Sequence, residues 1–187
     1  MRLFVAAELP EEEKHRLEDL CRRRDWFGFG EGWRAVATKN LHLTLKFLGE
    51  VTDERATHVA EALKSVPWPA SLALQTEGVT FFPPRGPINV FVARLGGADV
   101  EQLRQLHADI ELALEPLGFP REARPFNPHV TLLRADHRRK PKGFIRQLVA
   151  NNPPTPGQPF VMNSFVLFQS HLKQGGPEYV ALARYGG

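Results

Sequence analysis

The chain has 187 residues, 42% of them hydrophobic and 24% charged, and its 24 basic and 21 acidic residues leave a formal net charge of +3. These values are ordinary for a globular protein, and the small positive charge is compatible with a polyanionic partner but does not require one. The single cysteine, Cys21, excludes an intrachain disulfide and a thiolate metal cluster, and no apolar run reaches the roughly 18 residues that a membrane-spanning helix needs.

The first half of the chain alternates predicted strands and helices. Its first apolar run lacks a small-residue cleavage site, so we expect a buried strand rather than a signal peptide, and a cytoplasmic protein. A proline followed by acidic residues favours a helix start after this run, and Thr52 favours a second one. In chain order we predict a strand over 2–9, a helix over 10–24, a glycine-rich loop over 26–33, a strand over 40–50 and a helix over 52–66.

The second half of the chain contains the clearest helix and several predicted strands. Apolar residues recur every three or four positions over 98–118, and Gly118 ends that pattern, as expected for an amphipathic helix. The other predicted elements are strands over 71–82, 88–95 and 124–134, a short helix over 140–152, and strands over 160–172 and 178–185.

The order of these elements predicts an α+β fold in a single domain over residues 1–187. A strand, a helix and a second strand follow one another twice, beginning at residues 2 and 88, which indicates a weak internal duplication. We therefore expect two similar, intertwined lobes, each an antiparallel sheet with helices, that face one another across a central cleft. No linker in the sequence is long enough to separate independent domains, and the lack of an exposed apolar heptad predicts a monomer.

The same polar pair interrupts two otherwise apolar strands. His42 and Thr44 lie in NLHLTLKFLGE, and His129 and Thr131 lie in RPFNPHVTLLR. Because side chains alternate along a strand, each pair shares one face while its aliphatic neighbours share the other. Two such strands in similar lobes can present two imidazoles and two hydroxyls to one cleft.

Two imidazoles across a cleft suit acid–base catalysis near neutral pH. With an ordinary pKa of about 6.5, one can accept a proton while the other donates one. Threonine hydroxyls beside them can donate hydrogen bonds to a phosphoryl oxygen whose charge grows during reaction. The pattern therefore favours phosphoryl transfer to water with departure of an alkoxide, without a required metal or cofactor. Zinc is the rival interpretation of paired histidines, but no third ligand is clearly placed to complete such a site.

Other charged residues near the triplets are weaker candidates. Arg134 lies five residues after His129 and can reach a phosphate from the strand end, although strict alternation turns it away from the cleft. Lys46 shares the parity of His42, or it simply reaches solvent. The basic run at 137–142 is either a contact for an RNA backbone or a solvated loop.

The motifs resemble those of a known family. HLTLKFLGE and HVTLLR are similar to the paired HxTx motifs of the two-histidine (2H) phosphoesterase superfamily. More narrowly, they resemble the RNA 2′,3′-cyclic phosphodiesterases, also called 2′-5′ RNA ligase-like proteins. The start RLFVAAELP, the tryptophan of GWRAV and the late segments SFVLFQSHL and GPEYVALARY extend the resemblance over nearly the whole chain.

The resemblance implies a bilobal α+β fold and metal-independent hydrolysis of an RNA or nucleoside 2′,3′-cyclic phosphate to a 2′-phosphomonoester. It implies that His42 donates a proton to the departing 3′ oxygen and that His129 accepts one from water, a distinction that the residues alone do not make. Thr44 and Thr131 would hold the nonbridging oxygens. Because the substrate must carry a ribose 2′ oxygen, the implied partners are RNA ends or nucleotides with a cyclic phosphate.

Two other functions stay open beside hydrolysis. The first is joining of RNA ends through a 2′-5′ bond, although hydrolysis should dominate in water because the sequence shows no ATP-charging lysine motif. The second is noncatalytic binding of RNA or nucleotides, against which the two intact triplets argue. Base recognition is open as well, with Phe47, Phe126 and Trp33 as candidates either for stacking on a base or for the core.

Overall fold

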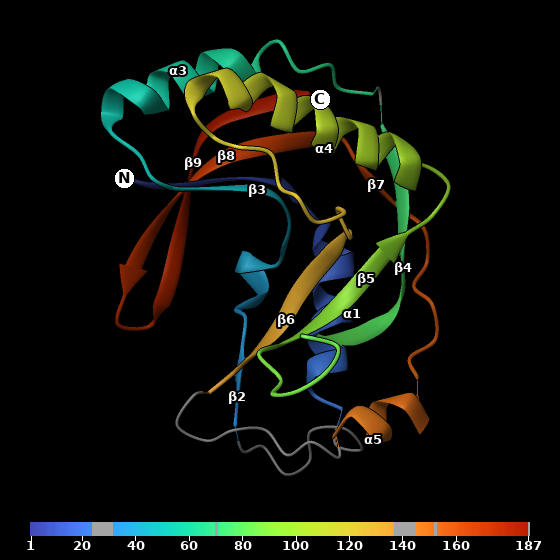
Figure 1. Cartoon of the computed structure of the whole chain (residues 1–187). Coiled ribbons are helices and arrows are strands. Elements are labelled where there is room, and N and C mark those ends of the chain that lie inside the picture. Colours follow the sequence, from blue (N-terminus) through green and yellow to red (C-terminus); the bar gives the residue numbers. More distant parts are fainter. Residues whose placement is uncertain (24–31, 70, 137–144, 152, 187) are drawn as a thin grey trace.

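The structure is a computed structural model that describes residues 1–23, 32–69, 71–136, 145–151 and 153–186, and its strands form one curled antiparallel sheet (Figure 1). The order along the sheet is β7-β4-β5-β6-β3-β1-β8-β9, and β2 pairs with β6. The strands are β1 (Arg2–Glu8), β2 (Trp33–Ala35), β3 (His42–Glu50), β4 (Leu72–Phe82), β5 (Val90–Gly96), β6 (His129–Ala135), β7 (Phe160–Met162), β8 (Ser164–Lys173) and β9 (Gly176–Gly186). The helices are α1 (Glu11–Cys21), α3 (Asp53–Leu63), α4 (Val100–Leu114) and α5 (Ile145–Asn151), with short 3-10 turns η1 (Thr38–Asn40) and η2 (Glu115–Leu117). The predicted α+β fold with two lobes is confirmed.

The long elements match the predictions better than the short ones. Each described helix lies within a predicted range, and the Thr52 hydroxyl accepts a hydrogen bond from the Arg55 amide (3.3 Å) at the start of α3. Strand β2 was not predicted, and the strand predicted over 160–172 is divided into β7 and β8 at Asn163. None of the helices in the described ranges is long and apolar enough to cross a membrane.

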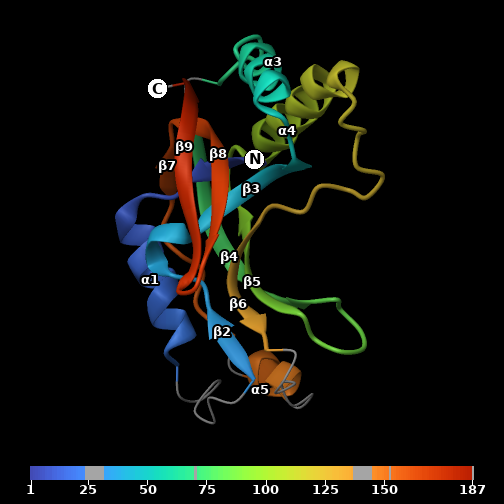
Figure 2. The same ribbon diagram turned by 90° about the vertical axis from the view of Figure 1, so that its left-hand side faces the viewer.

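The two lobes meet at one strand pair, and helices α1 and α4 each contact both lobes. Strands β3 and β6 pair through Leu43 and Val130. Helix α1 packs against both η1 and β6, and α4 packs against both β3 and β4, so each helix contacts elements of both lobes. Helices α3 and α4 lie side by side at one end of the molecule, whereas the β8–β9 hairpin reaches towards η1 and β2 (Figure 2). The two helices therefore connect the lobes to one another.

One face of the sheet belongs to the main core, and this determines where the triplets point. In β1, Leu3 and Val5 join the main core, whereas Phe4 joins a second cluster on the opposite face. The triplet strands continue the alternation, with Leu43 and Val130 fully buried in the main core. Burying such a side chain contributes roughly 1.5–3 kcal/mol relative to leaving it exposed. The histidine and threonine of each triplet are thus left on the face opposite the core, as alternation predicts.

Candidate active site

The two triplets come together where β3 and β6 pair. Their central residues lie opposite one another in an antiparallel register. Because the partner strand runs the other way, this register places His42 beside Thr131 and Thr44 beside His129. All four residues are half-buried. The site therefore has a two-fold arrangement in which each histidine neighbours the threonine of the other lobe.

Backbone carbonyls hold both imidazoles in the same tautomer. Nδ1 of His42 lies 2.7 Å from the Asn40 carbonyl oxygen, and Nδ1 of His129 lies 2.7 Å from the Asn127 carbonyl oxygen. Since a carbonyl oxygen only accepts, each Nδ1 carries a proton and donates it. The Nε2 atoms are then left for proton exchange, and that of His42 lies 3.0 Å from the Thr44 hydroxyl. Both histidines thus offer the same nitrogen to a substrate.

Aromatic rings and positive charges surround His42. Its ring lies 5.0 Å from the Phe4 ring and 5.4 Å from the Tyr179 ring, which meets it edge-on. Burial lowers the pKa of His42 to about 4, and the positive charge of Arg134 adds to the lowering despite the backbone hydrogen bond at Nδ1. In the free protein His42 is therefore neutral at pH 7.

The surroundings of His129 are different. Its ring lies 5.5 Å from the Phe82 ring of β4, at a tilt of 57°. Directly opposite His129 in the sheet is Arg94 of β5, which is exposed. The second histidine thus has a cationic neighbour at the position where the first has the carboxylate of Glu8.

A bulge in β6 brings Arg134 to the site. The β5–β6 ladder shifts by one residue immediately after Thr131, because Leu132 is an extra residue. The extra residue reverses the alternation that follows, so Arg134 turns to the face of the triplet rather than away from it. Arg134 is exposed, and its charge lies near enough to lower the pKa of His42. Strict alternation therefore assigned Arg134 to the wrong face.

The corresponding bulge in β3 has the opposite consequence for Lys46. The β1–β3 ladder shifts immediately after Thr44, with Leu45 as the extra residue. Lys46 is turned into the interior, where its Nζ donates to the Glu111 carboxylate (2.6 Å) and to the Pro120 carbonyl (2.9 Å). Lys46 is only 3% exposed, so the expectation that it faces the cleft or solvent is wrong. Its ion pair instead ties α4 to β3.

The three aromatic candidates for base stacking occupy different environments. Phe47 is 61% exposed, and its ring lies near that of Phe4 on the face of the site. Trp33 and Phe126 both pack against the main core, and Phe126 stacks on the His107 ring at 4.0 Å. Of the three, Phe47 alone is accessible from the site. The basic run at 137–142 lies outside the described residues.

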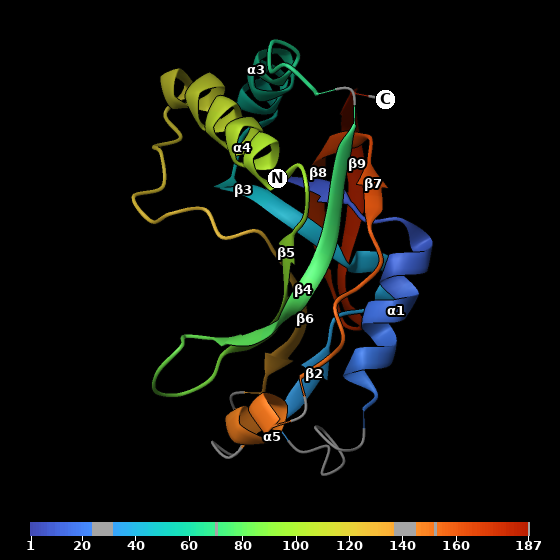
Figure 3. The ribbon, with the colours of Figure 1, turned by 90° about the vertical axis from the view of Figure 1, so that its right-hand side faces the viewer.

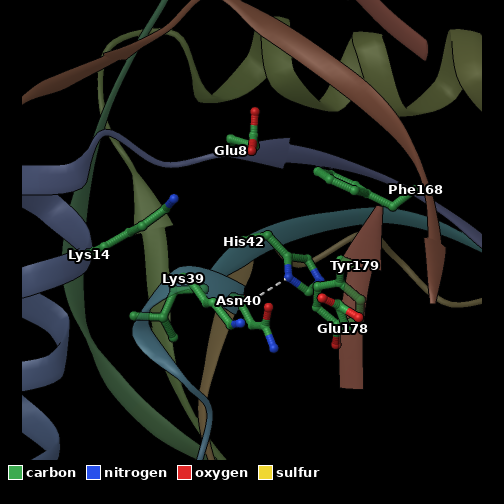
Figure 4. A pocket seen from close by; sticks show the side chains of 9 residues that line it. Glu8, Lys14, Lys39, Asn40, His42, Phe168, Glu178 and Tyr179 are labelled. Atoms are coloured by element: carbon green, nitrogen blue, oxygen red, sulfur yellow. Dashed lines mark hydrogen bonds between the residues drawn. The ribbon is translucent and has the colours of Figure 1, made fainter. Parts of the chain in front are cut away.

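A pocket of about 250 Å³ adjoins His42 (Figure 4). Phe168 and Tyr179 form one side of it, and Lys14 points into it from α1. Three of its charged lining residues take part in ion pairs, which are Glu8 with Arg184, Lys14 with Glu11, and Glu178 with Lys173, and Lys39 adds a further positive charge. The pocket thus combines aromatic surface with polar and charged side chains, which suits a flat and partly polar group such as a nucleobase.

Each triplet belongs to a longer repeated motif that the sequence analysis missed. Asn40 and Asn127 each lie two residues before a histidine, so both segments read Asn-x-His-x-Thr. Both carbonyls orient a histidine, but Asn40 is also buried, and its side-chain amide donates to the Pro177 carbonyl at 2.7 Å. The repeated asparagine was a usable signal. Tyr179 offered none, because it reaches His42 from a strand distant in sequence.

The arrangement is suited to phosphoryl transfer. Two imidazole Nε2 atoms provide a proton acceptor and a donor, and two hydroxyls with one guanidinium provide hydrogen bonds to phosphate oxygens. In the described parts of the chain, no group of three or more histidine, cysteine, aspartate or glutamate side chains is placed to hold a metal ion.

Comparisons with known proteins point to the same chemistry. A family model described as the 2′-5′ RNA ligase superfamily matches residues 31–173. The chain is similar to the RNA 2′,3′-cyclic phosphodiesterase of Aeropyrum pernix, with 33% identity over 87% of this chain and 92% of the relative. It is similar to that of Thermus thermophilus, with 32% identity over 99% of this chain and 89% of the relative.

Solved structures share the fold. A crystal structure of a Thermus thermophilus protein has a TM-score of 0.79 at 28% identity, over 100% of this chain and 97% of that chain. Escherichia coli LigT complexed with 3′-AMP has a TM-score of 0.72 at 29% identity, over 99% of this chain and 97% of that chain. That complex carries a nucleotide on a closely similar fold.

Proposed function

The chain belongs to the 2′-5′ RNA ligase superfamily of two-histidine phosphoesterases, and from this premise we propose that it hydrolyses the 2′,3′-cyclic phosphate of an RNA end or nucleoside to a 2′-phosphomonoester. The observation that carries the proposal is the meeting of both triplets at one strand pair, with Nδ1 of each histidine already committed to a carbonyl. The substrate class comes from relatives that are 30–33% identical over most of this chain and are named RNA 2′,3′-cyclic phosphodiesterase.

In the proposed reaction, a water molecule attacks phosphorus on the side opposite the 3′ oxygen. Nε2 of His129 accepts a proton from the water as the new P–O bond forms and the bond from phosphorus to the 3′ oxygen breaks. Nε2 of His42 donates a proton to that oxygen, which leaves as a hydroxyl, and the phosphate stays on the 2′ oxygen. Each of these acid–base roles is typically worth about 10²–10⁴-fold in rate. The protons balance, because one histidine gains what the other gives up.

We assign the nonbridging phosphate oxygens to Thr44, Thr131 and Arg134. Donors that are already aimed at the position where negative charge grows stabilise the transition state more than the bound substrate. The guanidinium of Arg134 adds a full positive charge and two parallel donors, which match a phosphate. The bulge that turns Arg134 to the face of the site supports this role.

Substrate binding is expected to raise the pKa of His42, so that the imidazole takes up from solvent the proton that it later donates. In the free protein the pKa of His42 is lowered to about 4, so the imidazole carries little positive charge at pH 7. A phosphodiester anion within hydrogen-bond reach of Nε2 favours the protonated ring. His42 would therefore become an acid when the substrate arrives, which makes its donor role compatible with its low pKa.

Two alternatives differ from hydrolysis in outcome. The description of the family model favours ligation, in which the 5′-hydroxyl of a second RNA replaces water and yields a 2′-5′ bond. Hydrolysis is preferred because water is present everywhere and the sequence shows no ATP-charging lysine motif. The second alternative, noncatalytic binding of RNA or nucleotides, leaves the shared tautomer of the two histidines without a purpose. A cytoplasmic location and a monomeric state remain predictions.

The test is hydrolysis of adenosine 2′,3′-cyclic phosphate in excess EDTA, with the products resolved as 2′- or 3′-phosphate. The proposal predicts turnover that chelation does not change, with the 2′-phosphate as product. A 3′-phosphate product would mean that the leaving oxygen is assigned wrongly. A failure to hydrolyse both this nucleotide and an RNA with a cyclic end would overturn the proposed function.

A further inference from the structure

The two lobes carry different charges at equivalent positions beside the triplets. The residue opposite His42 is Glu8, whose carboxylate pairs with Arg184. The residue opposite His129 is Arg94. The cross-strand partner of His42 is therefore a carboxylate that is already paired, whereas the cross-strand partner of His129 is a cation.

The Arg94 side chain extends away from its partner His129 and across the neighbouring strand β4. It pairs with Gly78 of β4, and a Cβ added at Gly78 would lie 3.3 Å from a guanidinium nitrogen of Arg94. A larger residue at position 78 would crowd the arginine, so the glycine leaves room for the side chain to lie there. The guanidinium of Arg94 therefore lies over β4, on the side of β5 away from His129.

A groove of about 310 Å³ begins at that guanidinium. It is lined by residues 77–81 of β4, by α5 and by residues 153–154. Strand β7 pairs with β4 only through Leu72–Leu74, so within the described chain residues 77–81 have no strand neighbour on their outer side. Helix α5 packs against β4 and forms the other wall (Figure 3). Within the described parts of the chain, the groove is thus bordered by a strand edge whose outward backbone groups pair with no other strand.

Arg146 of α5 supplies a second positive charge in this groove. It donates to two backbone carbonyls of the β4–β5 turn, at 2.8 and 3.1 Å, and its guanidinium lies 5.6 Å from the centre of the Phe81 ring. These contacts orient the guanidinium without cancelling its charge. Glu77 also lines the groove, but among the described residues no carboxylate forms an ion pair with Arg94 or Arg146. Two cations against one anion leave the groove positive.

We propose that this groove, formed by residues 77–81 with Arg94 and Arg146, binds a backbone phosphate of the RNA strand upstream of the cyclic end. Guanidiniums and strand-edge amides are donors that match phosphate oxygens, and contacts of this kind position a strand without reading its sequence. Arg94 links the groove to the site, because it lines the groove and is also the cross-strand partner of His129. The inference rests on the proposed function and makes an RNA of two or more nucleotides a better substrate than a mononucleotide.

The experiment compares kcat/KM for adenosine 2′,3′-cyclic phosphate with kcat/KM for the dinucleotide ApA that ends in the same cyclic phosphate. The proteins are the wild type, Arg94→Gln and the control Lys64→Gln, which removes an exposed charge beside α3 that does not line the groove. We expect the wild type to prefer the dinucleotide, and Arg94→Gln to lose about tenfold on the dinucleotide, as for one charge-assisted hydrogen bond. Its loss on the mononucleotide should be much smaller, and Lys64→Gln should resemble the wild type.

Three outcomes would contradict phosphate binding in the groove while leaving the proposed function intact. They are a wild type without preference for the dinucleotide, a preference that survives in Arg94→Gln, and an equal loss on both substrates in that variant. A wild type that hydrolyses neither substrate would instead overturn the proposed function. In that case, equal affinity of wild type and Arg94→Gln for single-stranded ApA with a terminal 2′-phosphate would contradict phosphate binding in the groove as well.

Discussion

At Nε2 of each histidine the same chemistry is available, because both rings donate their Nδ1 proton to a carbonyl two residues earlier. The two histidines differ in the residues that surround them. His42 packs against Phe4 and Tyr179, whereas His129 has Arg94 opposite it in the sheet. We infer that anionic ligands are favoured over neutral ones of the same shape, since only an anion offsets the repulsion among the positive charges around His42.

The enclosure of His42 makes folding stability depend on pH. Its pKa in the folded state is about 4, below the ordinary 6.5, so the unfolded chain binds this proton first as the pH falls. Above about pH 6.5 the neutral His42 does not lower the free energy of unfolding. Between about pH 6.5 and pH 4 the free energy of unfolding falls progressively, because the unfolded chain binds the proton and the folded protein does not. Relative to His42→Asn, the wild type should lose roughly 2 kcal/mol of unfolding free energy between pH 7.5 and pH 5. Urea unfolding at both pH values measures this, and equal losses in the two proteins would contradict it.

Removal of the Arg134 charge should change both His42 and the substrate. In Arg134→Gln we expect the pKa of His42 to rise, because repulsion between like charges is removed, and kcat/KM to fall about 10- to 100-fold. An NMR titration of the His42 ring and steady-state kinetics measure the two effects. Arg121→Gln, which removes an exposed arginine paired with Glu115, is the matched control. An unchanged pKa with an unchanged rate would exclude Arg134 from the site.

At the scale of elements, one residue ties η1 to the β8–β9 hairpin. The Asn40 carbonyl holds the His42 ring, and the Asn40 side chain holds the Pro177 carbonyl at the start of β9. Two residues further along β9, Tyr179 packs edge-on against the same His42 ring. The position of the hairpin and the orientation of the His42 ring are therefore coupled.

Two asparagine variants test whether the contact between Asn40 and the hairpin orients His42, or whether loss of any asparagine side chain near a histidine has the same effect. Asn40→Ala removes a buried hydrogen bond, and we expect it to cost about 1–2 kcal/mol of stability and to lower kcat more than it raises KM. In Asn127→Ala, which removes an exposed amide that donates to Pro125 in its own loop (3.1 Å), both effects should be smaller. Steady-state kinetics and urea unfolding of the pair decide the matter. Equal effects would mean that the hairpin contact does not orient His42.

The parts of the fold that were predictable are those with long periodic patterns. Helix α4 and the two triplet strands were found because their apolar residues keep one period over many positions. The bulges were not found, because Leu45 and Leu132 are as apolar as their neighbours and do not mark an inserted residue. The faces of Lys46 and Arg134 were consequently misassigned, although the triplets before the bulges were placed correctly.

For the whole molecule, we propose that the two lobes form one cooperative domain. The packing of α1 and α4 against elements of both lobes supports this, as does a main core that includes residues of both. Trp33 lies in β2 beside β6, and Trp68 packs near Phe165 of β8, so variants that keep one of these tryptophans report on different regions. We expect their fluorescence transitions in urea to coincide with the far-ultraviolet circular dichroism transition. Transitions at clearly separate urea concentrations would indicate two independent domains.

The most direct test of the central claim, that a histidine from each lobe acts in a single site, is the rate of cyclic phosphate hydrolysis in His42→Ala, His129→Ala and the double variant. The measurement uses excess EDTA, and urea unfolding confirms that each variant is folded. We predict that each single variant loses about 10²–10⁴-fold in kcat/KM, and that the double variant loses far less than the product of the two, because the residues act as a unit. A rate close to that of the wild type in either single variant would contradict the claim.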